Sequence, residues 1–209
     1  MNRKRKSLLI ALSIGDGILT KEQDAKVANL KITYPIDMID YMNYKSSIMK
    51  KTFGKKHTLI ENEEYCELSF THKYLRLLKK WMFPAGRLNY AKYTCYLNEL
   101  GLAIWYMDRG YTYFEDKKDG TITMEFNLAL NKPDCETIIK MFKDKWNLNF
   151  YLHKKEEKIY NIRCYKKDSI EFAKLINKYM TKSMKYKISF LKNYIQESVA
   201  SNKKDEDVL

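Results

Sequence analysis

The sequence predicts an α+β protein made of two pseudo-symmetric halves, each with an antiparallel sheet and helices. An apolar run over residues 9–17 aligns without gaps on residues 102–110, and both runs end in Gly. Gly most readily supplies the left-handed C-cap, so each run is expected to be a helix that stops there. The same order of helical and alternating stretches follows each run, which predicts two copies of one α+β unit.

The first half, residues 1–90, opens with the motif helix at 8–17. A strand-like alternating stretch at 28–34 follows, then a helical stretch around 36–51, a strand at 65–71 and a helix around 74–82. Because successive strand residues face opposite sides, Leu30, Ile32 and Tyr34 are expected on the buried face. The other face would then carry Asn29, Lys31 and Thr33.

The second half, residues 91–200, opens with the motif helix at 101–110. Its strands are predicted at 121–128, 149–153 and 160–165, and its helices around 135–146 and 170–179. Alternation places Ile122, Met124, Phe126 and Leu128 inside, with Thr121, Thr123, Glu125 and Asn127 outside. Residues 201–209 are charged and unpatterned and are expected to form a frayed tail.

The charge balance favours a polyanionic partner. The chain has 209 residues, with 39 Lys+Arg against 26 Asp+Glu and a net charge of +13. Each phosphate neutralised by a cation releases counterions, so DNA or RNA suits this surplus, although a basic surface without a partner is the plain alternative. A membrane partner is not expected, because no apolar run is long enough and no isolated basic amphipathic helix is found.

The cysteines and histidines exclude the common zinc folds. Four Cys without a CxxC pair, together with three His, do not form a zinc-finger or HNH-type pattern. Reduced thiols are expected. We therefore expect a cytoplasmic chain, with an organellar matrix or the cytoplasm of a phage-infected cell as equivalent settings.

The outward strand positions are candidate nucleic-acid contacts, because hydrogen-bonding and cationic side chains can reach base edges and phosphates. An ordinary solvated sheet face is the alternative for each strand. The predicted contacts are Asn29, Lys31, Thr33, Ser69, Thr71, Thr121, Thr123, Asn127, Asn149, Tyr151, His153, Asn161, Arg163 and Tyr165.

The repeated runs resemble the motifs of the single-chain LAGLIDADG homing endonucleases. Residues 102–110, Leu-Ala-Ile-Trp-Tyr-Met-Asp-Arg-Gly, are similar to that family's LA-x-W-[FY]-M-D-D-G form with one change, and the first run ends Gly15-Asp16-Gly17. Residues 184–187, Met-Lys-Tyr-Lys, resemble a family M-x-Y-K segment. The resemblance extends over residues 8–190.

The resemblance implies two αββαββα halves with saddle-shaped sheets, in a monomer that straddles a long asymmetric site in double-stranded DNA. The motif helices would lie side by side, with small residues allowing close approach: Ala11, Gly15, Gly101 and Ala103. Carboxylates at the helix ends would bind Mg²⁺, which activates a water and stabilises the leaving oxygens.

Carried over by position, Asp16 is the first metal ligand, although a helix-end Asp in a turn is its plain alternative. Arg109 stands where the second carboxylate belongs, and a guanidinium has no lone pair for a metal. Asp108, one residue earlier, would offer only its backbone carbonyl. Lys187 matches a basic active-site residue, unless it is a surface lysine, and Arg87 is the candidate for its first-half counterpart.

We therefore expect tight binding to double-stranded DNA, with Mg²⁺-dependent cleavage greatly weakened or lost and at most slow nicking. Arg109 could pair with Asp16 or with a DNA phosphate and supply a cation without metal. The basic residues 3–6 could form a phosphate-touching arm or a disordered tail. Two other functions stay open: an RNA-binding intron maturase and a cleavage-dead regulatory DNA-binding factor.

Overall fold

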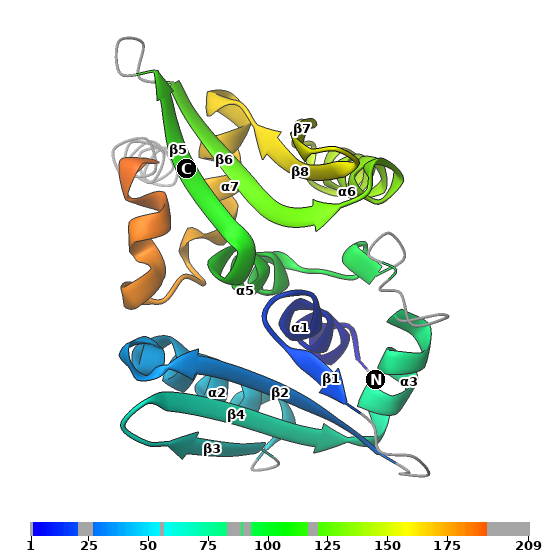
Figure 1. Ribbon diagram of the computed structural model, residues 1–209, viewed down its shortest axis with the longest axis vertical. Coiled ribbons are helices and arrows are strands. Elements are labelled where there is room, and N and C mark those ends of the chain that lie inside the picture. Colours follow the sequence, from blue (N-terminus) through cyan, green and yellow to red (C-terminus); the bar gives the residue numbers. More distant parts are fainter. Residues whose placement is uncertain are drawn as a thin grey trace, which may run out of the picture. The chain divides into compact units, whose positions relative to one another are not determined.

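The computed structural model describes residues 2–20, 27–54, 57–82, 89, 93–116 and 121–191 (Figure 1). The chain forms two compact units, Met1–Arg109 and Gly110–Leu209. The α-helices and strands whose bounds the structure gives follow the order αββαββα twice, with a four-stranded antiparallel sheet in each unit. This order confirms the predicted fold class. This division differs from the predicted one. The sequence repeat placed the boundary between residues 90 and 91, whereas the compact units place the second motif helix in the first unit.

The first unit contains α1 (Arg3–Ile14), β1 (Ile18–Thr20), β2 (Ala28–Pro35), the 3₁₀ helix η1 (Ile36–Met38), α2 (Ile39–Phe53), β3 (His57–Glu61), β4 (Tyr65–His72), α3 (Lys73–Met82) and α5 (Glu99–Arg109). Its strands lie in the order β1-β2-β4-β3. Leu30, Ile32 and Tyr34 are buried, as the alternation of β2 predicts. α2 packs on this buried face, where the Phe53 and Phe70 rings lie 5.0 Å apart.

The second unit contains β5 (Gly110–Asp116), β6 (Thr121–Leu130), α6 (Lys132–Trp146), β7 (Phe150–Glu156), β8 (Ile159–Cys164), α7 (Lys166–Asn177) and the 3₁₀ helix η3 (Lys182–Leu191). Its strand order, β5-β6-β8-β7, repeats that of the first unit. Four Phe rings from β6, α6, β7 and α7 form the core, with centroid separations from 4.2 to 6.1 Å: Phe126, Phe142, Phe150 and Phe172.

Helix α6 shows how local sequence sets the element ends in this unit. The Asn131 side chain caps its first turn by accepting a hydrogen bond from the Asp134 backbone N–H, and Pro133 stands in that turn. Asn147 ends the helix with φ 53°, a left-handed conformation that Asn tolerates better than most residues. The chain then turns directly into β7.

Helices α1 and α5 pack against each other within the first unit, and this confirms the predicted role of small residues. A Cβ atom on Gly101 would lie 2.4 Å from Ser7 Oγ, and one on Gly15 would lie 2.0 Å from Asp108 Oδ2. The Ser7 hydroxyl also donates to Asn98 Oδ1 at 2.8 Å and accepts from the Asn98 backbone N–H at 2.9 Å. The close packing of α1 against α5 therefore excludes residues larger than Gly at positions 15 and 101.

The sequence did not show where β1, β3 and β5 lie. β1 has three residues, and β3 shows no clean alternation between buried and exposed positions. β5 begins at Gly110, immediately after the motif helix, so its start is hidden by the motif itself. No helix in the described part of the chain is long and apolar enough to cross a membrane.

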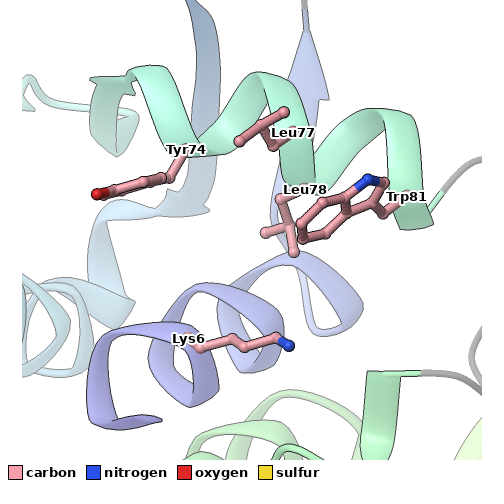
Figure 2. A pocket seen from close by; sticks show the side chains of 5 residues that line it. All are labelled: Lys6, Tyr74, Leu77, Leu78 and Trp81. Carbon is pink, nitrogen blue, oxygen red and sulfur yellow. The ribbon is translucent and has the colours of Figure 1, made fainter. Parts of the chain in front are cut away.

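A pocket of about 330 Å³ opens between α1 and α3 (Figure 2). Leu78 and Trp81 extend from α3 toward α1, where Lys6 lies, and Tyr74 and Leu77 complete the lining. The described lining residues contribute three polar side-chain groups, the Lys6 ammonium, the Tyr74 hydroxyl and the Trp81 indole N–H, and no carboxylate. Neither Asp16 nor Asp108 lines this pocket.

We predict that Gly101→Ala lowers the free energy of unfolding by about 1–3 kcal/mol, because the new methyl group meets Ser7 and Leu97. Helix propensity alone predicts the opposite sign, a gain of roughly 0.5–1 kcal/mol. Denaturant unfolding of the variant measures the sign, with Ser47→Ala on the exposed side of α2 as the control. A Gly101→Ala protein more stable than the wild type would contradict the packing described above.

Candidate functional site

Asp16 lies in a tight turn at the end of α1. Within this turn the Gly17 backbone N–H donates to the Leu12 carbonyl at 3.0 Å. A Cβ atom at Gly17 would lie 2.3 Å from that carbonyl oxygen, so only Gly fits there. The turn brings the Asp16 backbone N–H to 3.3 Å from Asp108 Oδ2 of α5. The ends of the two motif helices are thus joined at the candidate site.

The Arg109 guanidinium binds oxygen atoms that a metal ion would need as ligands. Its Nη2 lies 3.2 Å from Asp16 Oδ1 and donates to the Gly15 carbonyl at 2.9 Å, and its Nε donates to the same carbonyl at 3.2 Å. The Arg109 side chain is 45% exposed and that of Asp16 is 27% exposed. The pairing of Arg109 with Asp16, one of the two arrangements left open by the sequence, is the one found.

The Asp108 side chain is buried, and both oxygens of its carboxylate accept hydrogen bonds. Oδ1 forms an ion pair with the Lys45 ammonium at 2.7 Å and accepts a hydrogen bond from the Tyr41 hydroxyl at 2.6 Å. Neither the Lys45 nor the Asp108 side chain has exposed area. Asp108 was a candidate metal ligand only through its backbone carbonyl, and its carboxylate serves structure instead.

Sequence reasoning missed Lys45, which connects the two carboxylates. Its ammonium donates to the Tyr34 hydroxyl oxygen at 2.7 Å, and that hydroxyl lies within hydrogen-bond distance of both carboxylates, 2.8 Å from Asp16 Oδ2 and 3.1 Å from Asp108 Oδ1. A lysine on a helix normally faces solvent. The available signal was the spacing of Tyr41 and Lys45, which places both on one face of α2.

The site is electrically neutral, because the two carboxylates face the two cations Lys45 and Arg109. Burial raises the pKa of Asp16, and the Asp108 charge raises it further; the Tyr34 hydrogen bond and the two cations oppose this. Burial, together with the nearby carboxylates, also raises the pKa of Tyr34 and of Tyr41. Both phenols therefore stay protonated and keep donating to the carboxylates.

These residues do not fit a Mg²⁺ ion, which prefers six oxygen ligands in near-octahedral geometry. Arg109 covers Asp16 Oδ1 and the Gly15 carbonyl, Tyr34 donates to Asp16 Oδ2, and Asp108 is held by Lys45. Across the ranges that the structure describes, no cluster of three or more His, Cys, Asp or Glu residues could hold a metal. A fixed guanidinium takes the place where the resemblance implied a second ligand.

The predictions for three sets of basic residues, Lys187, Arg87 and residues 3–6, have different outcomes. Lys187 lies in η3, where its ammonium donates to the Gly110 carbonyl at 3.0 Å and sits 5.2 Å from the centroid of the Tyr111 ring. Arg87 lies outside the described residues. Neither an arm nor a disordered tail is found at residues 3–6, because they form the first turn of α1, which Asn2 caps by accepting from the Arg5 backbone N–H.

In the first sheet the predicted contacts share one face. Lys31, Thr33 and Thr71 are exposed, whereas Asn29 and Ser69 are half-buried. The Ser69 and Thr71 hydroxyls both donate to Asn29 Oδ1, at 3.0 and 3.3 Å. This face therefore offers a polar, hydrogen-bonded surface, with Lys31 paired to Glu67 at 2.6 Å.

In the second sheet two predicted contacts are corrected, because Thr123 and Asn161 are buried. The side-chain Oδ1 of Asn161 accepts from the backbone N–H groups of Leu128 and Ala129, and its side-chain Nδ2 donates to Glu125 Oε1. Alternation along the strands indicated the correct face, but it could not show that this face is covered near its centre. Asn161 therefore links β8 to β6, and neither the Thr123 nor the Asn161 side chain is exposed to a ligand.

The remaining predicted residues of this sheet keep exposed or half-buried positions: Asn127, Asn149, Tyr151, His153, Arg163 and Tyr165. The Tyr151 and Tyr165 rings stack with centroids 4.4 Å apart, and Asn149 binds Asp168 through its backbone N–H and its amide. Of Thr121, only the backbone position in β6 is described. Tyr111 and Tyr113, which sequence reasoning missed, pair in register with Glu125 and Thr123.

We predict that Lys45→Met lowers the free energy of unfolding by about 3–5 kcal/mol, because it leaves the Asp108 carboxylate buried without its cation. The double variant Lys45→Met/Asp108→Asn should regain most of that loss, since it removes the uncompensated charge. Lys50→Met, on the exposed side of the same helix, is the control and should change stability by less than about 0.5 kcal/mol. A Lys45→Met protein as stable as this control would refute the role given to the ion pair.

One family model and several solved structures match this chain. The model of the LAGLIDADG DNA endonuclease family matches residues 6–172. Among solved structures, the homing endonuclease I-WcaI bound to its DNA recognition sequence is 22% identical with a TM-score of 0.73, covering 89% of this chain and 86% of that one. I-GzeII in complex with its DNA target is 13% identical with a TM-score of 0.51, covering 98% and 92%.

A third structure, I-DmoI in complex with DNA and Mn, is 16% identical with a TM-score of 0.50 and covers 83% of this chain and 96% of that one. At these identities the likenesses show the shared fold. No curated protein sequence matches the chain significantly.

Proposed function

Because the chain belongs to the LAGLIDADG DNA endonuclease family, we propose that it binds a long, asymmetric site in double-stranded DNA, with Mg²⁺-dependent cleavage greatly weakened by Arg109. The observation that carries this proposal is the Arg109 guanidinium, which lies against Asp16 and the Gly15 carbonyl. The site would thus keep the geometry of a family active site without its metal.

The surplus of positive charge supports DNA binding. A net charge of +13 favours a polyanion, and cations contacting phosphates release counterions. The exposed polar faces of the two sheets supply donors and acceptors suited to base edges in a major groove. Phosphate contacts would provide most of the affinity, and the side chains on the sheets would provide the sequence preference.

The charge at position 109 argues against efficient cleavage. In the family pattern a second carboxylate stands at this position, so Arg109 changes the local charge by two units toward positive. Two unit charges 4 Å apart interact by about 4 kcal/mol at an effective dielectric constant of 20. Arg109 would therefore repel a divalent ion in addition to withholding a ligand, while its cation attracts a phosphate.

We predict that Arg109→Asp restores Mg²⁺-dependent cleavage and lowers the affinity measured without metal. The new carboxylate would supply the missing ligand, and the lost cation would no longer attract phosphate. Sites are first selected from a random duplex pool, and the products formed in Mg²⁺ or Mn²⁺ are then separated on a gel. The matched control is Arg109→Asn, which removes the cation without adding a carboxylate and should not restore cutting to the same extent.

Three results would contradict the proposal. Efficient cutting of both strands by the wild-type protein would show that Arg109 does not disable the site. Strong preference for structured intron RNA over the selected duplex, in a direct competition, would replace the DNA partner. In addition, log affinity should fall steeply with log salt concentration, and a flat dependence would contradict binding led by phosphates.

A further inference from the structure

Four side-chain positions form a row across the sheet of the second unit. In register, Tyr111 of β5 pairs with Glu125 of β6, Glu125 with Arg163 of β8, and Arg163 with Tyr151 of β7. Positions paired directly across neighbouring strands lie on the same face of a sheet. The row therefore places one carboxylate and one guanidinium between two tyrosines, on the face that we propose meets DNA.

Glu125 is buried and rigidly held in this row. Its Oε2 accepts a hydrogen bond from Arg163 Nε, and its Oε1 accepts from the Asn161 amide at 2.6 Å. Asn161 is itself anchored by the backbone N–H groups of Leu128 and Ala129, at 3.0 and 3.1 Å. Ala129 has φ 51° at the point where the β6–β8 register shifts. The side-chain amide of Asn161 therefore links this irregularity in β6 to the Glu125 carboxylate.

Arg163 is held on two sides by this arrangement. Its side chain is 19% exposed, its Nε is bound to Glu125, and its guanidinium carbon lies 5.3 Å from the centroid of the Tyr113 ring. The first sheet offers a contrast, because its acid–base pair, Lys31 on β2 and Glu67 on β4, is diagonal in register and leaves the Lys31 side chain 46% exposed. Arg163 is therefore the more firmly positioned of the two cations.

A guanidinium fixed in one orientation suits the recognition of guanine. Arginine reads guanine by donating to its O6 and N7 acceptors, a geometry that depends on the orientation of the guanidinium plane. Fixing a side chain before binding lowers the entropy lost when the contact forms. A carboxylate facing DNA would repel phosphates, whereas one buried beside Arg163 can direct that cation without meeting the DNA.

We propose that Glu125 is a positioning residue for sequence recognition, which orients Arg163 to recognise one guanine in the bound duplex. This inference rests on the proposed DNA binding and adds the base that this part of the sheet selects. Glu125 acts through Arg163. Asn161, which was predicted as a DNA contact, holds Glu125 in place.

The test compares the base preferences of the wild-type protein and its variants by selection from a random duplex pool. Arg163→Gln should lose preference for guanine at one position by about 10-fold or more, with little change elsewhere. Glu125→Gln, which keeps the size of the side chain, should weaken the preference at the same position. The charge control is Lys174→Gln on α7, whose ammonium pairs with Glu171; it should leave every base preference unchanged.

Different outcomes separate this inference from the proposed function. If the wild type selects a duplex but Arg163→Gln or Glu125→Gln leaves the guanine preference intact, the inference is overturned while DNA binding stands. Uniform weakening at all positions would also overturn it, because that result indicates a phosphate contact or a purely structural role. If the wild type selects no duplex, the proposed binding to double-stranded DNA is itself contradicted.

Thermal unfolding is measured for each variant before selection. If Glu125→Gln is unfolded at the assay temperature, the double variant Glu125→Gln/Arg163→Gln replaces the charged pair with two neutral amides. This variant should lose the guanine preference at the same single position. Retention of that preference by the double variant would overturn the inference.

Discussion

The buried ion pair between Lys45 and Asp108 is the interaction on which the candidate site depends. It joins α2 to the end of α5, and through the Tyr34 hydroxyl it reaches β2 and Asp16. Both charges lie away from water, where either one alone would be strongly destabilising. The strand, the two helices and the turn at Asp16 are therefore constrained together, so the candidate site is fixed by the core of the first unit.

This constraint explains why Arg109 pairs with Asp16 and not with Asp108. Lys45 already balances Asp108, so only Asp16 remains to attract a further cation. The Arg109 guanidinium pairs with the Asp16 carboxylate and also donates a hydrogen bond to the Gly15 carbonyl. A metal ion would have to displace that guanidinium and bind fewer oxygens than it prefers. The same neutral arrangement lets a DNA phosphate approach without the repulsion of two bare carboxylates.

The sequence predicted most of the architecture, because helix and strand periodicities are local properties. It predicted the paired motif helices and the buried side of β2, and one of the two arrangements that it left open for Arg109 is the one found. It could not reveal Lys45, because burial of a lysine depends on partners that are distant in the chain, Asp108 above all. It also placed Thr123 and Asn161 among the DNA contacts, since alternation identifies a face without showing what covers it. Arg87 stays a prediction.

The central claim is that Arg109 occupies the place of the metal, and a crystal structure of the protein bound to a selected duplex, grown with Mn²⁺, tests it most directly. Anomalous scattering locates Mn²⁺ independently of the refined coordinates. The account predicts that the Arg109 guanidinium remains in contact with Asp16, with no anomalous peak at that carboxylate. A Mn²⁺ ion coordinated by Asp16, with Arg109 turned away, would contradict it.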